Sequence, residues 1–300
     1  ITWWFFMDKV VVIGGSGFMG SHTADELSNR GFDVTIFDKS ISPWLKENQN
    51  MIEGDMLDID QVSKAIKEAK FVYHFGGVAD IGDAKKIPFE TINHNVISAA
   101  VVMEAAAKEG VKRIIYASTM YVYSPYGSFY RASKQAAETI IEAYTEEYSL
   151  EHTLLRYGSL YGPRAQEWNG LKRYVDQVIR DGKLNYSGTG SERREYIHVK
   201  DAARLSVDIL DESHKNQAIT VTGNQVLNSN ELIDMIFEIA GVKKEVIINN
   251  KTKSNDHYTM TPYRYTPKAA KKLVPDEFID LGQGIFEIVE DIYNEIDKES

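Results

Sequence analysis

Short runs of apolar, β-branched residues alternate with stretches of helical periodicity through the first half of the chain. The runs lack the period-two alternation of a strand with one solvated face. Strands of this kind, separated by helices, indicate a parallel sheet covered on both faces. The predicted strands are Lys9 to Ile13, Phe32 to Asp38, Phe71 to Gly77, Val111 to Ser118 and His152 to Gly162, and the predicted helices are Phe18 to Arg30, Asp60 to Ala69, Asn93 to Glu109 and Tyr130 to Tyr148.

The pattern becomes less regular after Gly162, which predicts a smaller lobe beside the sheet. Helices are predicted at Gly170–Asp181, Val199–Leu210 and Ser229–Ala240, with a strand at "EVIIN" and a final acidic helix. We expect an α/β fold: a doubly wound parallel sheet domain over residues 1–164, with return segments at about 194–225, and a small α+β lobe over 165–193 and 226–300.

The segment "GGSGFMG" places Gly14, Gly17 and Gly20 at three-residue intervals between a strand and a helix. This spacing allows a tight turn, close approach of backbone to a pyrophosphate, and helix–strand packing. The amides at the helix start, at Phe18 and Met19, favour phosphate. An ordinary strand–helix turn is the alternative.

Asp38 ends the next strand, 18 residues beyond Gly20. A carboxylate there accepts hydrogen bonds from an adenosine ribose and repels a 2′-phosphate, which favours NAD over NADP. Lys39 beside it weakens that preference, because a lysine pairs with such a phosphate.

Tyr130 and Lys134 are four residues apart and therefore share one face of a predicted helix. A phenol has a pKa of about 10, and a nearby ammonium lowers it. A cationic nicotinamide would lower it further, so that Tyr130 exchanges a proton with a sugar hydroxyl while hydride moves to the nicotinamide. Ser118 and Thr119, at the preceding strand end, add two hydroxyls.

The composition excludes several classes of function. The net charge of −10 argues against nucleic-acid binding. The chain has no cysteine, which excludes disulfides and thiolate metal sites and fits a reducing, cytoplasmic location. No apolar run reaches the length of a membrane span, and the histidines show no metal spacing.

The start "ITWWFFMDK" is a poor signal peptide. Met7 is a candidate for the natural start. A strand extension is an equally good interpretation of residues 1–6.

These motifs, in this order, resemble the extended short-chain dehydrogenases/reductases of the nucleotide-sugar epimerase and dehydratase type. The resemblance spans nearly the whole chain, through "VVVIGGSGFMGSH", "EGDMLD", "YHFGG", "YASTMYVY", "YRASK", "LLRYGSLYGP" and "RREYIHVKDAA". It implies a Rossmann-type sheet with a bound NAD, a nucleotide-sugar substrate and a homodimer built on the helices Asn93–Glu109 and Tyr130–Tyr148.

The resemblance also implies roles for individual residues. Tyr130 would be the acid/base, Lys134 would lower its pKa and hold the nicotinamide ribose, and Thr119 would bond the sugar hydroxyl. The implied cofactor contacts are Asp55, Met56, Phe75, Gly76, Gly77, Ser118 and Tyr157, and the implied substrate contacts are Ser159 and Arg194. Asn95 matches the asparagine that the family carries near the start of this helix. His198 and Asp201 are interpreted as structural. Arg264 is a candidate for a second arginine that binds the diphosphate, and a surface residue is the equal alternative.

Departures from the family pattern favour one reaction. Met120 and Tyr121 stand where 4,6-dehydratases carry Asp and Glu, which points away from water elimination. The loop Ser124–Phe129 is short, so the sugar pocket is wider or built from elsewhere.

The leading hypothesis is therefore an NAD-dependent nucleotide-sugar epimerase that acts at C4 through a 4-keto sugar. The alternatives are a net NAD(P)-dependent oxidoreductase of the same fold and a non-catalytic redox sensor, and the intact Thr119, Tyr130 and Lys134 set argues against the sensor.

Overall fold

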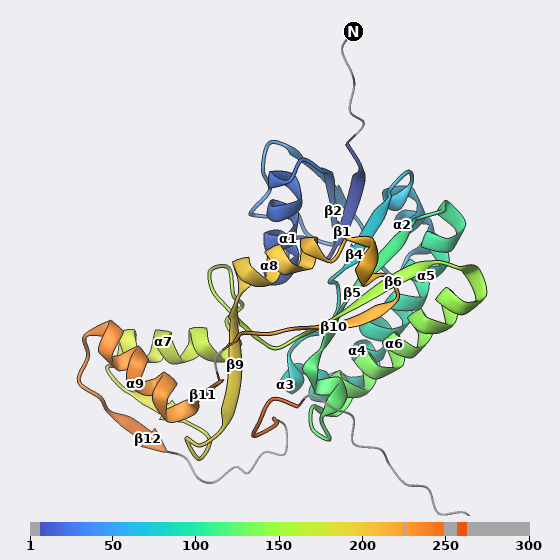
Figure 1. Ribbon diagram of the computed structural model, residues 1–300. Coiled ribbons are helices and arrows are strands. Elements are labelled where there is room, and N and C mark those ends of the chain that lie inside the picture. The colour runs from blue at the N-terminus through green and yellow to red at the C-terminus, as the bar shows by residue number, and fades with distance from the viewer. Residues whose placement is uncertain (1–6, 225, 249–256, 263–300) are drawn as a thin grey trace, which may run out of the picture. The chain divides into compact units, whose positions relative to one another are not determined.

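The computed structural model describes residues 7–224, 226–248 and 257–262, and within them seven strands form one parallel sheet (Figure 1). In spatial order these are β10 (Gln217–Val221), β6 (Glu151–Tyr157), β5 (Arg113–Thr119), β4 (Phe71–His74), β1 (Lys9–Ile13), β2 (Asp33–Asp38) and β3 (Gln49–Glu53). The order reverses at β1, which pairs with β2 on one side and β4 on the other. This confirms the predicted doubly wound sheet, in which ligands bind outside the carboxyl ends of the strands at such a reversal.

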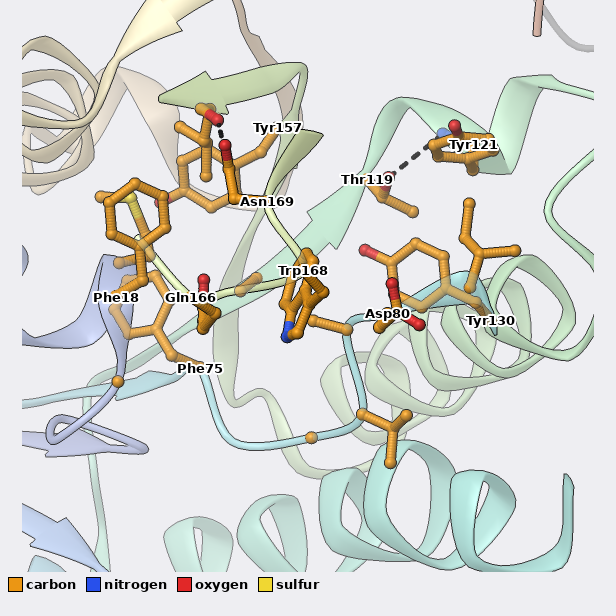
Figure 2. Close-up of a pocket in the computed structure, with 18 of the residues that line it drawn as sticks. Phe18, Phe75, Asp80, Thr119, Tyr121, Tyr130, Tyr157, Gln166, Trp168 and Asn169 are labelled. Carbon is orange, nitrogen blue, oxygen red and sulfur yellow. Dashed lines mark hydrogen bonds between the residues drawn. The ribbon is translucent and has the colours of Figure 1, made fainter. Parts of the chain in front are cut away.

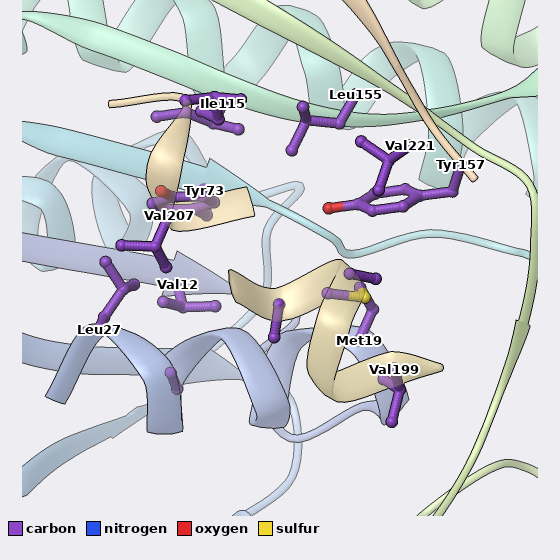
Figure 3. Packing of buried hydrophobic residues seen from close by; sticks show 14 of the residues in the cluster. Val12, Met19, Leu27, Tyr73, Ile115, Leu155, Tyr157, Val199, Val207 and Val221 are labelled. Carbon is purple, nitrogen blue, oxygen red and sulfur yellow. The ribbon is translucent and has the colours of Figure 1, made fainter. Parts of the chain in front are cut away.

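Helices cover both faces of this sheet, as the apolar strands predict. Val10 and Val12 of β1 join a buried cluster with α1 (Phe18–Asn29) and α8 (Val199–Asp208), shown in Figure 3. Val11 and Ile13 join a second cluster with the helices of the opposite face. Those helices are α2 (Ile59–Ile66), α5 (Ser98–Glu109) and α6 (Ser128–Tyr148). Successive strand residues thus meet apolar side chains on both sides, which is why the runs lack alternation.

A separate apolar cluster accompanies two smaller sheets. β7 (Ser159–Tyr161), β9 (Arg193–His198) and β11 (Val226–Asn228) form one, and β8 (Leu184–Tyr186) pairs with β12 (Val246–Ile248) in the other. The cluster joins α7 (Gly170–Asp181), β8 and α9 (Ser229–Ala240). Within the segment 194–225, α8 and β10 join the main sheet layer, whereas β9 lies in the small three-stranded sheet. The final acidic helix and Arg264 fall outside the described residues.

The predicted helix Asn93–Glu109 is not uniform. A π-helical turn at Asn93–Ile97 precedes α5, and α3 (Ile81–Lys86) and α4 (Pro88–Ile92) precede that turn. Asn95, on the π turn, is fully buried and bonds the main chain of Val78 through both ends of its amide, at 2.7 and 3.0 Å. The wide turn aims this side chain at the carboxyl end of β4, and π turns of this kind are frequent at functional sites.

Two further differences concern strands. The predicted strand His152–Gly162 is broken at Gly158, whose N–H donates to Val221 O at 2.9 Å, and β7 then pairs with β9 instead of continuing the main sheet. A Cβ on Gly158 would lie 2.5 Å from Thr222 Oγ1, so this crossing needs a glycine. Sequence analysis missed β3, which is an edge strand with polar residues and lacks an apolar run.

Across the described part of the chain, no helix combines the length and the apolar character that crossing a membrane requires.

Candidate active site

The glycine loop between β1 and α1 shows why each glycine is needed. Gly14 has φ +78°, and a Cβ there would lie 2.4 Å from Gly76 N. A Cβ on Gly20 would lie 2.2 Å from Gly14 O. Gly17 differs: its φ is −80°, and a Cβ there would meet nothing closer than Gly14 O at 3.4 Å. Packing therefore requires Gly14 and Gly20, whereas Gly17 keeps open the space before the helix.

That open space lies at the N-terminus of α1, which has no side-chain cap. The first N–H groups of a helix carry partial positive charge and favour a phosphate. The loop therefore fits the pyrophosphate of a dinucleotide on both steric and electrostatic grounds.

Asp38, at the end of β2, is held against this loop. One carboxylate oxygen accepts from the N–H of Ser16 at 3.0 Å, and the other accepts from the N–H of Ser40 at 3.3 Å. Each carboxylate oxygen has further lone pairs, so the group can still accept from the vicinal hydroxyls of a ribose. Lys39 beside it is exposed and lines the same cavity.

One cavity of about 1610 Å³ contains every residue that the sequence predicts for the site. They are Gly14, Gly17, Phe18, Met19, Gly20, Asp38, Lys39, Asp55, Met56, Phe75, Gly76, Gly77, Ser118, Thr119, Tyr130, Lys134, Tyr157, Ser159 and Arg194. The volume exceeds what one drug-sized ligand needs. It leaves room for a dinucleotide and a second, similarly large ligand end to end.

The predicted catalytic side chains meet at the carboxyl end of β5. Thr119 is the last residue of β5, and its hydroxyl accepts from the N–H of Tyr121 at 3.3 Å, with the phenol of Tyr130 from α6 in the same part of the cavity (Figure 2). Lys134, one turn further along α6, donates to Ala117 O at 2.7 Å and lies 3.3 Å from the hydroxyl of Tyr116. The ammonium is thereby fixed at the strand end, near the phenol.

Asn95 holds the start of α6 in place. Its amide donates to the Ser133 hydroxyl at 2.9 Å, and that hydroxyl donates to Tyr130 O at 2.9 Å. The π turn, the loop after β4 and the helix of Tyr130 are thus tied by one buried chain of hydrogen bonds, which preorganises the site.

The pKa of Tyr130 differs from the sequence prediction. Burial raises it to about 12, and the nearby hydroxyl of Thr119 lowers it less than burial raises it. Burial also lowers the pKa of Lys134 to about 8, opposed by the nearby Glu138. The prediction that Lys134 brings the phenol below its usual value is therefore wrong for the polypeptide by itself, because desolvation of the phenolate is the largest effect.

Two predicted cofactor contacts use their hydroxyls elsewhere. The hydroxyl of Ser118 donates to the carboxylate of Glu138, behind the strand end. The hydroxyl of Tyr157 bonds Ser206 on α8 at 2.6 Å, and its ring lies 6.4 Å from that of Phe75. Tyr157 therefore offers the cavity an aromatic ring, and Ser118 offers it main chain and Cβ.

The end of the cavity beyond the catalytic side chains is aromatic and basic. The guanidinium of Arg194 lies 4.9 Å from the ring centre of Tyr258 and near the hydroxyl of Tyr121. That hydroxyl bonds Nδ1 of His257 at 2.6 Å, and the rings of Tyr121 and Tyr258 are 4.6 Å apart. Arg194 is thus held between phenols, which suits a planar cation that binds phosphate.

Sequence reasoning missed several residues that line the cavity: Gln61, Asp80, Tyr121, Gln166, Trp168, Arg173 and His257. Two of them had a signal in the sequence. Tyr121 departs from the family pattern, and Asp80 begins "DIGD", a helix N-cap signal three residues after Gly77. His198, interpreted as structural, caps α8 by accepting from the N–H of Lys200 at 3.3 Å.

Fold and cavity together define a Rossmann-type, dinucleotide-dependent enzyme. The chain belongs to the NAD dependent epimerase/dehydratase family, whose model matches residues 10–222. This confirms the predicted family, and the family's dependence on NAD agrees with the predicted cofactor.

Two similar proteins and one solved structure mark the range of reactions among its relatives. The chain is 30% identical to UDP-glucose 4-epimerase of Bacillus subtilis over 67% of this chain and 72% of that protein. It is 26% identical to UDP-N-acetyl-alpha-D-glucosaminuronate decarboxylase of Bacillus cytotoxicus over 80% and 82% of the two chains. The crystal structure of UDP-glucose 4-epimerase of Thermotoga maritima superposes with a TM-score of 0.78 at 24% identity, covering 86% of this chain and 90% of that one, which supports the fold.

Proposed function

We propose that this chain is an NAD-dependent nucleotide-sugar epimerase that inverts C4 of a nucleoside-diphosphate hexose through a transient 4-keto sugar. The observation that carries the proposal is the convergence of Thr119, Tyr130 and Lys134 on the same cavity as the glycine loop.

The residues that would hold the cofactor follow from the site. The open cradle at Gly17 takes the pyrophosphate, Asp38 accepts from the adenosine ribose, and Asp55 and Met56 lie near the adenine. When bound, NAD supplies the hydride acceptor and donor, and its nicotinamide carries a positive charge. Lys134 reaches the nicotinamide ribose from the strand end.

Tyr130 moves the proton. Its phenolate takes the proton of the C4 hydroxyl when the sugar is oxidised, and the phenol so formed returns that proton to the C4 oxygen when the keto group is reduced on its other face. Thr119 holds the sugar hydroxyl against the phenol. Because burial raises the pKa of Tyr130 to about 12, the positive charges of Lys134 and the nicotinamide must together lower it during turnover.

The substrate's other groups would be held at the basic end of the cavity. Arg194 grips the diphosphate, aided by the phenols that fix its guanidinium, and Ser159 lies on the way to the sugar. We propose that residues 165–193 and the described residues from 226 to 262 belong to a lobe that covers the substrate beside the sheet domain of residues 1–164; the rest of the predicted lobe, through residue 300, falls outside the described residues.

The side chains after Thr119 support epimerisation over dehydration. Neither Met120 nor Tyr121 has a carboxyl group for water elimination; Met120 is fully buried, and the hydroxyl of Tyr121 bonds His257.

Pure protein loaded with NAD⁺ tests the proposal in a panel of UDP-, dTDP-, GDP- and CDP-hexoses, with products resolved by NMR. We expect inversion at C4 of at least one hexose with no net change in nicotinamide absorbance. Tyr130→Phe should abolish turnover and retain NAD⁺ binding. Tyr148→Phe is the matched control, since Tyr148 lies at the far end of α6 and its side chain is exposed. A fully active Tyr130→Phe variant would refute the mechanism.

A net oxidoreductase is the second candidate. It is favoured by the exposed Lys39, which lines the cavity beside Asp38 and suits a 2′-phosphate. Stoichiometric change in nicotinamide absorbance with added NAD(P)(H) would select this reaction over epimerisation.

We also propose a cytoplasmic homodimer. Apolar side chains are exposed near the helices named for the contact, including Phe89, Ile97 and Phe129 at 69%, 46% and 43%. A single species of twice the chain mass in light scattering is the expected result, and a monomer would contradict it.

A further inference from the structure

The corner of the cavity beside Tyr130 is acidic on one side and aromatic on another. Asp80 lies there, at the N-cap of α3, and Trp168 lies on the loop before α7 (Figure 2). The two also line a smaller recess of about 340 Å³ that adjoins the cavity. Segments far apart in sequence therefore bring a carboxylate and an indole to the place where the reacting sugar would sit.

The carboxylate of Asp80 is only half used by the fold. Its Oδ1 accepts from the N–H of Asp83 at 2.7 Å. Among the described residues, no ion pair or other hydrogen bond neutralises the side chain, and Lys86, the nearest lysine of that recess, pairs with Asp83 at 2.9 Å instead. The second oxygen of Asp80 is free to accept from a ligand hydroxyl.

The charges that line the cavity differ from one side to the other. Asp80 and Glu90 stand on the side of α3 and α4, whereas Arg173 and Arg194 stand on the side of the small sheets. Glu192 also lies on that second side, where its carboxylate accepts from the Tyr186 hydroxyl and the Thr189 N–H, and Lys134 lines the cavity near Tyr130. The arginines suit a diphosphate, and the carboxylates suit neutral hydroxyls and oppose an anion.

Trp168 adds an apolar wall. Its side chain lines the cavity and is 39% exposed, so the indole is accessible to a bound ligand. An indole face opposite a carboxylate matches a pyranose, which presents C–H groups on its faces and hydroxyls at its edge.

The proposed contact of C4 with Tyr130 brings the C6 substituent of the sugar to this corner of the cavity. If the C4 hydroxyl contacts Tyr130, C6 lies two bonds away through C5, among the neighbours of that phenol. A C6 carboxylate would then approach Asp80, and two like charges in a partly buried cavity repel strongly.

We infer that Asp80, with Trp168 as the apolar wall, restricts this site to nucleotide sugars whose hexose is uncharged, and excludes uronic acids. The inference rests on the proposed function. It separates this chain from its relative of Bacillus cytotoxicus, which is named for a glucosaminuronate.

Binding to NAD⁺-loaded protein in the Tyr130→Phe background tests the inference without turnover. UDP-glucose and UDP-glucuronic acid differ only at C6, and the dTDP pair provides a second nucleotide. Calorimetry should give tighter binding of the glucose compound by about tenfold or more. Asp80→Asn keeps a good N-cap residue and should reduce that preference by about tenfold, chiefly through tighter binding of the uronate.

Asp60→Asn is the matched control, because it removes the same charge from the first turn of another helix, α2, at an exposed residue that lines neither the cavity nor the recess. It should leave the preference unchanged. Trp168→Phe should remove the fluorescence change caused by UDP-glucose, and Trp44→Phe should retain it.

Equal binding of glucose and uronate, or equal effects of Asp80→Asn and Asp60→Asn, would overturn the inferred preference for uncharged hexoses while leaving the proposed function intact. If no nucleotide sugar of the UDP, dTDP, GDP and CDP panel binds, the proposed function fails and the inference fails with it.

Discussion

Arg156 on β6 holds Glu138 on α6 with two of its nitrogens: Nη2 lies 2.6 Å from one carboxylate oxygen and Nε lies 3.0 Å from the other. The side chains are only 16% and 9% exposed. Glu138 also accepts from the hydroxyl of Ser118, and Arg156 also donates to that of Tyr123. This pair connects the helix that carries Tyr130 and Lys134 to the sheet, directly behind the strand end where the chemistry is proposed.

Removing Glu138 should therefore destabilise the fold. Glu138→Ala leaves the guanidinium of Arg156 buried without its counter-charge, which costs about 3–5 kcal/mol. Urea unfolding measures the loss. Asp83→Ala, which breaks the exposed pair with Lys86, is the control and should cost about 1 kcal/mol or less. Equal losses in the two variants would show that the buried pair contributes no more than a surface one.

Lys134 should make stability rise with pH above about 8. Burial lowers its pKa to about 8, so between that pH and the ordinary value of 10.5 the unfolded chain binds the proton and the folded chain has released it. Stability must then increase with pH across this window, by at most about 1.4 kcal/mol per pH unit. Unfolding of wild type and Lys134→Met at pH 7.5, 8.5 and 9.5 checks this: the difference between them should shift in favour of wild type. Parallel curves would contradict the burial of a charged lysine.

His74 should make the protein sensitive to acid. The imidazole is fully buried beside Lys134, and burial lowers its pKa to about 3. Below pH 6.5 the unfolded chain gains a proton that the folded chain does not, so stability is lost as the pH falls toward 3, again by at most about 1.4 kcal/mol per unit. His74→Phe removes this contribution. We expect its stability to fall less steeply than that of wild type between pH 6.5 and 4.5, by thermal or urea unfolding, and identical slopes would refute the assignment.

The glycine loop separates cofactor binding from folding. Gly17→Ala places a methyl group in the open cradle and should weaken NAD⁺ binding by about tenfold or more, while its change of N-cap costs only about 1 kcal/mol of stability. Gly20→Ala would put its Cβ 2.2 Å from Gly14 O and should destabilise the fold by about 3 kcal/mol. Calorimetric titration with NAD⁺ and urea unfolding distinguish the two. Unchanged NAD⁺ affinity in Gly17→Ala would remove the cradle from the proposed site.

The sequence predicted the architecture well because local signals agreed. β1, α1 and β2 follow from an apolar run, three glycines and a second apolar run, and all the nominated site residues line one cavity because strands of one direction end at one edge. The π turn at Asn93–Ile97 could not be predicted, since the helical periodicity continues through it and only the contacts of Asn95 require it.

By itself, the sequence determined the doubly wound sheet, the glycine loop and the shared helical face of Tyr130 and Lys134, because these depend on periodicity and on residues near in the chain. The tertiary structure decided how readily the phenol of Tyr130 ionises and which groups would surround the sugar. The pKa of Tyr130 rises through burial, and Asp80, Trp168 and Arg194 converge from distant segments. Desolvation and convergence depend on the packing of the whole fold, which no local pattern encodes.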